Sequence, residues 1–171
     1  MVMEAISRVD SSELVYNVVG HNGETDYLPL VKPEQPPPNA GNRWKVLRDI
    51  TSSIQFTISR DNTVESIEAS IKGLVKEDCE GGADKGKYDD LLLIALSDAN
   101  MGRYGITSQK LEQALNKSRE KVKGAVIFIG EETEAQRMAK ELPDKAYNCQ
   151  DLETLPILLS EVLMGMIGQG G

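Results

Sequence analysis

The sequence predicts a doubly wound α/β domain with a mostly parallel sheet and an antiparallel hairpin at one edge. Residues 91–96 are six consecutive apolar residues without helical or alternating period, which is typical of a strand buried on both faces of a parallel sheet. A second apolar run covers residues 125–129. Segments with helical spacing alternate with these strands from Thr63 onward, and this order predicts right-handed βαβ units.

The first part of the chain carries the predicted hairpin. Residues 1–9 have the apolar spacing of the end of an amphipathic helix. Strands are predicted at 14–19 and 25–31, joined by a His-Asn-Gly-Glu segment in which Asn-Gly favours a tight turn. Pro29 lacks a backbone donor, so the second strand is expected at a sheet edge.

The rest of the chain is expected to continue the same domain, so that residues 1–171 form one unit. Turn residues, capping residues and apolar spacing define its elements. These are a Pro-rich loop at 33–41, a short helix at 43–50, a helix begun by a capping box at 62–65, a Gly-rich loop at 80–87, a helix capped by Thr107 that runs to Lys117, a helix at 131–142, a strand at 146–149, and a helix from Leu155 followed by a flexible tail at 165–171.

Composition limits the classes of partner. The 171 residues are 40% hydrophobic, which is enough for one domain with a core. The net charge of −8 argues against nucleic acid and anionic membrane surfaces as partners, and favours a cation or a basic protein surface. No apolar run approaches the ~20 residues of a membrane span. Cys79 and Cys149 are isolated, which fits a reducing compartment, and no targeting signal is recognisable.

Two features of the sequence are only weak indications of a functional site. Gly81 to Lys87 matches the spacing of a phosphate-binding loop, but Tyr88 follows where a hydroxyl for Mg²⁺ is required, and the segment precedes a strand instead of following one. We therefore interpret it as a flexible connection. His21 is the only histidine, so a zinc cluster or a Ser-His-Asp set is not expected.

Thr63 and Asp98 are the candidate metal-binding residues. Asp98 follows the predicted strand at 91–96, where open α/β sheets bind their ligands, and Thr63 begins a helix. A hydroxyl and a carboxylate are hard oxygen donors that suit Mg²⁺ or Mn²⁺. The alternatives are that Thr63 is only a helix cap and that Asp98 only forms a turn.

Four blocks of sequence resemble the von Willebrand factor A (VWFA) domain family, in particular the C-terminal VWFA domain of a large mitochondrial AAA+ ATPase. They contain the segments Val-Gly-His-Asn-Gly-Glu, Asp-Asn-Thr-Val-Glu, Leu-Ser-Asp-Ala-Asn with Arg-Tyr-Gly-Ile, and Ala-Val-Ile-Phe-Ile-Gly. These blocks lie at 19–24, 61–65, 96–106 and 125–130, and the resemblance covers the chain from Met1 to Met164.

The resemblance implies a metal-ion-dependent adhesion site built from three loops, in which Thr63 and Asp98 match the threonine and the aspartate. The Asp-x-Ser-x-Ser motif and the first central strand of the family have no counterpart in this chain, and Arg60 stands where the family usually has glycine. We therefore expect Mg²⁺ or Mn²⁺ affinity to be weak or absent. The strands at 14–19 and 91–96, which would flank the missing strand, must pair directly or leave free edges that promote self-association.

The expected function is that of a protein-interaction module with a partial metal site, not an enzyme. The resemblance implies capture of an acidic residue of a protein partner, with Asn100, Arg103 and Tyr104 forming the neighbouring contact surface. It also implies that the chain is a fragment of a larger mitochondrial protein associated with an AAA+ ATPase. The alternatives are a small nucleotide-binding enzyme that uses Gly81 to Lys87, and a truncated product without a ligand.

Overall fold

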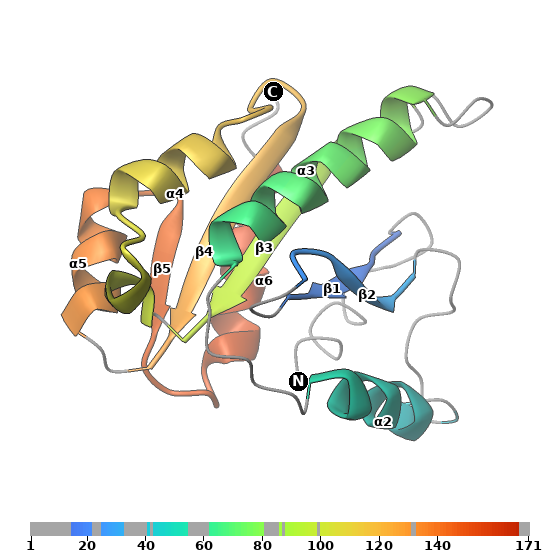
Figure 1. The fold of residues 1–171 in the computed structure, drawn as a ribbon, viewed down its shortest axis with the longest axis horizontal. Coiled ribbons are helices and arrows are strands. Elements are labelled where there is room, and N and C mark those ends of the chain that lie inside the picture. Colours follow the sequence, from blue (N-terminus) through green and yellow to red (C-terminus); the bar gives the residue numbers. More distant parts are fainter. Residues whose placement is uncertain are drawn as a thin grey trace.

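The computed structural model describes residues 15–21, 25–32, 41, 43–54, 62–80, 86, 88–98, 100–130 and 133–167. Figure 1 shows its helices and strands. In chain order they are β1 (Val18–Gly20), β2 (Leu28–Val31), α2 (Arg43–Ile54), α3 (Thr63–Glu80), β3 (Leu91–Ser97), the 3₁₀ helix η2 (Asn100–Tyr104), α4 (Ser108–Leu115), β4 (Val122–Ile129), α5 (Thr133–Glu141), β5 (Ala146–Cys149) and α6 (Leu155–Ile167).

A three-stranded parallel sheet in the order β3-β4-β5 forms the centre of the fold. β3 pairs with β4 from Leu91 opposite Val122 to Ser97 opposite Phe128. Helix α4 connects β3 to β4, and α5 connects β4 to β5. The α/β class and the parallel pairing predicted from the sequence are therefore confirmed, because the apolar runs in β3 and β4 do lie side by side.

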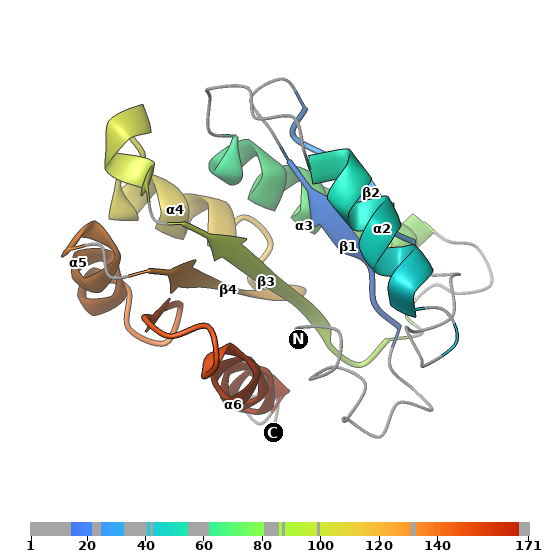
Figure 2. The ribbon, with the colours of Figure 1, turned by 90° about the horizontal axis from the view of Figure 1, so that it is seen from below.

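Helices cover both faces of this sheet, as Figure 2 shows. One face packs against α3, α4 and α5 in a cluster of buried residues that includes Ile71, Leu111, Leu115, Phe128 and Met138. The other face packs against α6 in a second cluster, formed by Ala125, Ile127, Cys149, Leu155, Leu159, Val162 and Met166. Apolar side chains on both sides of β4 explain why its sequence does not alternate.

β1 and β2 form a separate two-stranded antiparallel sheet. The antiparallel hairpin predicted from the sequence is confirmed, but its strands are shorter than predicted. β1 covers Val18–Gly20 instead of 14–19, and β2 covers Leu28–Val31 instead of 25–31. An irregular register between Val18 and Val19 and the missing donor of Pro29, which lies opposite Val19, limit the ladder.

The two sheets are not joined, because within the described residues no strand pairs with β3 on the side away from β4. The alternative of direct pairing between the strands predicted at 14–19 and 91–96 is therefore wrong. Burial of β3 is also lower than predicted. Its residues from Leu92 to Ala95 are only partly buried, and Leu96 is 37% exposed, since β3 forms an edge of its sheet.

Several helix boundaries also differ from the prediction. α2 continues to Ile54 instead of ending at residue 50, since no breaker follows, and Glu80 belongs to α3 instead of the Gly-rich loop. α6 continues to Ile167, so the first part of the tail predicted at 165–171 is helical. The predicted helix at 1–9 lies outside the described residues, as do 33–40 of the Pro-rich loop. None of the described helices is long and apolar enough to span a bilayer.

Candidate functional site

The first turn of α3 places Thr63 in the interior. The carbonyl oxygen of Asn62 accepts a hydrogen bond from the Ser66 backbone nitrogen at 2.8 Å, so Asn62 holds the N-cap position and Thr63 is the first helical residue. Thr63 is 3% exposed and Ser66 is 7% exposed. Thr63 is thus a buried polar residue at the helix start and does not occupy the N-cap position itself.

Asp98 directly follows β3 and is exposed. Its Oδ1 accepts a hydrogen bond from the Asn100 backbone nitrogen at 3.2 Å, an arrangement that turns the chain out of the strand. Both interpretations of Asp98 from the sequence therefore remain compatible with its position. It forms the turn, and its carboxylate still faces solvent at the carboxyl end of a parallel strand.

The residues after Asp98 form the 3₁₀ helix η2. Met101 is fully buried and packs into the core, while Arg103 is exposed and its guanidinium lies 5.9 Å from the centre of the Tyr104 ring. Hydrogen bonds from the Gly105 and Ile106 backbone nitrogens to the Gly102 and Met101 carbonyls, at 3.2 and 3.1 Å, close the turn. Met101 therefore anchors the segment that carries the predicted contact residues Asn100, Arg103 and Tyr104.

The start of α3 and the carboxyl end of β3 lie side by side in both views (Figures 1 and 2). Ile67, one turn after Thr63, and Met101, three residues after Asp98, belong to the same buried cluster. The structure therefore brings the two segments that carry Thr63 and Asp98 to the same edge of the molecule. Thr63 faces the interior there, whereas Asp98 faces solvent.

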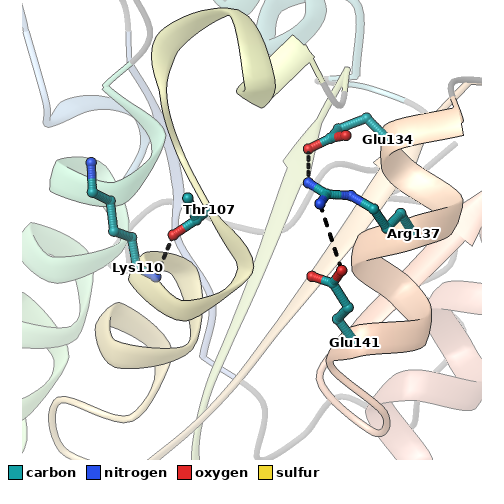
Figure 3. Close-up of polar contacts among 5 residues, drawn as sticks. All are labelled: Thr107, Lys110, Glu134, Arg137 and Glu141. Atoms are coloured by element: carbon teal, nitrogen blue, oxygen red, sulfur yellow. Dashed lines mark hydrogen bonds and ion pairs between the residues drawn. The ribbon is translucent and has the colours of Figure 1, made fainter.

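Glu134, in the first turn of α5, lies close to η2 and pairs with Arg137. Figure 3 shows the Arg137 guanidinium between two carboxylates, 2.5 Å from Glu134 Oε1 and 3.7 Å from Glu141 Oε1. The hydrogen bond to Glu134 and the charges of both acids raise the pKa of Arg137. A side chain at Gly102 would come within 3.5 Å of Glu134, so η2 and α5 are closely packed.

The start of α4 follows the sequence prediction. The Thr107 hydroxyl accepts a hydrogen bond from the Lys110 backbone nitrogen at 3.3 Å, as Figure 3 shows, and Lys110 Nζ donates to the Gly105 carbonyl at 3.0 Å. The predicted cap is therefore confirmed. This cap marks the end of the segment that begins at Asp98. Gly105, with a φ of +68°, turns the chain just before the helix.

The described part of the chain contains no group of three or more His, Cys, Asp and Glu side chains that could hold a metal ion. Thr63 and Asp98 offer one hydroxyl and one carboxylate as oxygen donors. Mg²⁺ prefers octahedral oxygen coordination and retains several waters, so these two donors alone would hold a weakly bound, largely hydrated ion.

The other residues singled out in the sequence are His21, the segment from Gly81 to Lys87, and Cys149. His21 directly follows β1 and is half-buried. Of the segment from Gly81 to Lys87, only Gly86 is described, in a turn with a φ of +68°. Cys149 is buried as a free thiol, and its Sγ lies 3.1 Å from the Asp151 carbonyl oxygen.

Comparison with known proteins adds one informative similarity. The chain is 32% identical over 164 residues to von Willebrand factor A domain-containing protein 8 of Mus musculus. The matched stretch covers 95% of this chain. This similarity supports a VWFA-like domain. The parallel sheet with helices on both faces agrees with this identification, and the resemblance predicted from the sequence is confirmed.

The matched stretch covers 8% of the length of the mouse protein, so this VWFA-like domain corresponds to a small part of that relative. A scan against protein-family models finds no match. A search of solved structures finds none either. Sequence similarity to the mouse protein and the α/β fold therefore carry the identification together.

Sequence reasoning missed the role of Met101. The segment Ala-Asn-Met-Gly-Arg-Tyr-Gly has the composition of a loop, which gives no indication that one of its side chains is buried. The spacing of Met101, Tyr104 and Ile106 could have indicated a turn packed on the core, since all three contribute to the buried cluster. Such a short spacing is a weak signal without knowledge of the neighbouring helices.

Proposed function

We propose that this VWFA-like domain is a non-catalytic protein-interaction module whose contact surface lies at the carboxyl end of β3. The exposed carboxylate of Asp98 carries this proposal. Within the described residues it forms no ion pair, and its one hydrogen bond, to Asn100, leaves oxygen lone pairs available to a ligand. The likeness to a VWFA domain-containing protein supports the same function.

Asn100, Arg103 and Tyr104 extend this surface. Met101 fixes their segment to the core, so the three side chains are presented from a well-packed turn. The exposed guanidinium of Arg103 offers planar, charged hydrogen-bond donors that match a carboxylate. An acidic residue of a protein partner is therefore the group that this surface would bind.

A hydrated Mg²⁺ or Mn²⁺ held by Thr63 and Asp98 would add a second attraction for that acidic residue. Both donors are hard oxygens, and they come from two segments that meet at one edge of the molecule. Affinity in this chain is expected to be low, because the described residues contain no group of three or more His, Cys, Asp and Glu side chains that could hold a metal ion. Burial of Thr63 also requires a local movement before its hydroxyl can reach an ion.

We also propose that the chain acts as part of a longer mitochondrial protein that accompanies an AAA+ ATPase. The small share of the mouse relative that it matches supports a role within a larger protein. Immunodetection of the endogenous protein, with measurement of its length and its compartment, tests this. A product of the length of this chain, or one outside mitochondria, would contradict it.

A Mn²⁺ titration followed by amide NMR tests the proposed site. We expect line broadening to begin at Thr63, Asp98 and Asn100, because a paramagnetic ion broadens the nearest amides first. Asp98→Asn should abolish this local broadening. Asp89→Asn is the matched control, since Asp89 is also exposed and precedes the same strand, and it should leave the broadening unchanged.

Two results would contradict the cation site. One is broadening that is spread over the acidic surface without a centre at Asp98. The other is an equal effect of the two Asn substitutions. Binding of an acidic peptide to Arg103 would still be measurable without metal, and Arg103→Ala should remove it, so the interaction surface and the cation can be tested separately.

A further inference from the structure

Helix α2 exposes the only tryptophan of the chain. Trp44 is 74% exposed, the largest exposed fraction among the large apolar side chains of the described residues, and Leu47, one turn later, is 43% exposed. A helix face in contact with water normally carries charged and polar side chains. Tryptophan, in contrast, is enriched among the residues that contribute most to binding at protein interfaces. The outer side of α2 is therefore a candidate binding surface.

The exposed side chains of α2 form one continuous surface, because they follow the spacing of three and four residues that makes neighbours on a helix. Ile50 lies off this surface and is half-buried, and α2 contacts β2. In both views α2 lies at the opposite end of the molecule from α5 (Figures 1 and 2). We call this surface the α2 face, formed by the exposed residues Trp44, Lys45, Leu47, Arg48, Thr51 and Ser52.

The α2 face is basic, although the chain as a whole is acidic. Its charged side chains are Lys45 and Arg48, and none of its six residues is an acid. The sequence of α2 contains three basic residues and one acidic residue, whereas the chain has a net charge of −8. A surface that is both apolar and basic complements a partner that is both apolar and acidic.

A short acidic segment of a protein fits this surface better than a membrane does. Tryptophan with lysine and arginine is also the pattern of a helix that lies on an anionic bilayer. A bilayer is an extended surface, however, and would also meet the rest of a chain whose net charge is −8. Charges more than ~8 Å apart are largely screened at physiological salt, so a short segment interacts mainly with the α2 face itself.

We propose that the α2 face binds an acidic amphipathic helix of a protein partner, whose leucine or aromatic side chains cover Trp44 and Leu47. The glutamates or aspartates of that helix pair with Lys45 and Arg48 at the rim of the contact. A helical partner fits because side chains four residues apart on α2 form ridges that pack into the grooves of a second helix. This surface is separate from the one proposed at the end of β3, and neither proposal depends on the other.

A synthetic helical peptide somewhat longer than the 12 residues of α2 is a suitable probe. It carries leucines three and four residues apart, glutamates on either side of them, and no tryptophan. Because Trp44 is the only tryptophan of the chain, its emission reports contact at the α2 face, and we expect a saturable shift to shorter wavelength that weakens with added salt. Two control peptides, one with lysine in place of glutamate and one with the same residues in scrambled order, should bind roughly tenfold more weakly or worse.

Charge reversal on α2 tests the electrostatic part of the proposal. Lys45→Glu together with Arg48→Glu should weaken binding of the acidic peptide roughly tenfold, since two attractions become repulsions. The matched control is Lys72→Glu together with Lys76→Glu on α3, where both lysines are also exposed. This control changes the net charge by the same amount, so it should weaken binding by no more than about twofold at physiological salt.

Removal of the tryptophan tests the apolar part, with the anisotropy of a labelled peptide as the readout. Trp44→Ala should weaken binding roughly tenfold, whereas Trp44→Phe, which keeps an aromatic ring, should retain most of the affinity. Ile157→Ala on α6 is the control, because Ile157 is 62% exposed, and it should leave binding unchanged. Arg103→Ala should leave the Trp44 emission shift unchanged, so failure at the end of β3 and failure at the α2 face are distinguishable.

Four results would overturn the proposal. These are an unchanged Trp44 emission at saturating peptide, equal binding of the scrambled peptide, a shift produced by anionic phosphatidylserine vesicles but not by the peptide, and a shift that grows with the concentration of the chain alone. The last would mean that a second copy covers the α2 face. The control peptides are measured against the native chain, so the test stays decisive even if a variant unfolds.

Discussion

Replacing Met101 with alanine tests how the interaction surface is held on the core. Met101 is fully buried and carries η2, so truncation removes three buried non-hydrogen atoms. At about 0.8 kcal/mol for each methylene-sized group, the transfer cost is about 2.4 kcal/mol. The cavity left behind raises the expected loss of unfolding free energy to about 3 kcal/mol.

Met164 provides the matched control, because it is 63% exposed on α6. Met164→Ala should change the unfolding free energy by no more than ~0.5 kcal/mol. Urea denaturation followed by circular dichroism measures both variants. Thermal unfolding should show Met101→Ala melting about 6–12 °C below the native chain, at about 2–4 °C per kcal/mol for a domain of this size.

Hydrogen exchange adds a local readout for Met101→Ala. Amides from Asn100 to Ile106 should exchange faster than the global loss of stability requires, since their anchor is gone. A difference of less than ~1 kcal/mol between the two methionine variants would refute the reasoning. It would mean that the packing around Met101 collapses without cost and does not hold η2.

Three further substitutions test the packing around two glycines and the raised pKa of Tyr147. Gly124→Ala would bring a methyl group to 3.0 Å from Leu115 Cδ2 and should cost about 1–3 kcal/mol in urea denaturation. Gly165→Ala, with open space around it in α6, should stabilise by about 0.5 kcal/mol, and equal effects at the two glycines would contradict this account. Burial, with the charge of Asp144 second, raises the pKa of Tyr147. Its contribution to stability is therefore complete below the unfolded value of about 10 and is lost as pH rises through the folded value. Tyr147→Phe should lose less stability than the native chain above about pH 10, and parallel pH profiles of unfolding free energy would be inconsistent with this.

The elements that sequence analysis predicted well are those determined by local chemistry. β5 begins and ends where predicted, and Thr107 caps α4 through a hydrogen bond to Lys110. A cap depends on residues three apart, and a buried strand needs only a short apolar run, so both leave a direct trace in the sequence. The same reasoning explains why the parallel pairing of β3 with β4 was predictable.

The position of β3 in its sheet could not be predicted from its residues. An apolar run predicts a strand covered on both faces, and the structure does cover both faces of β3. Whether a second strand also pairs with its backbone depends on the rest of the chain. The start of β1 was likewise mispredicted, because a register irregularity at Val18 and Val19 arises only once β2 is paired.

The candidate site was partly predictable for the same reason. The positions of Thr63 at a helix start and Asp98 at a strand end followed from local patterns, and the structure confirms both. Burial of Thr63 was not predictable, since it results from packing of α3 on the sheet. The anchoring of Asn100, Arg103 and Tyr104 through Met101 also depends on tertiary contacts.

The carboxylate at the end of β3 sets a requirement for binding of the proposed acidic partner. Four basic side chains of the described residues are paired with acids, in Lys117–Glu68, Lys123–Asp90, Arg137–Glu134, Arg137–Glu141 and Lys145–Glu112. Asp98 is not among these acids, and its carboxylate would repel an approaching acidic residue unless Arg103 or a divalent cation offsets that repulsion.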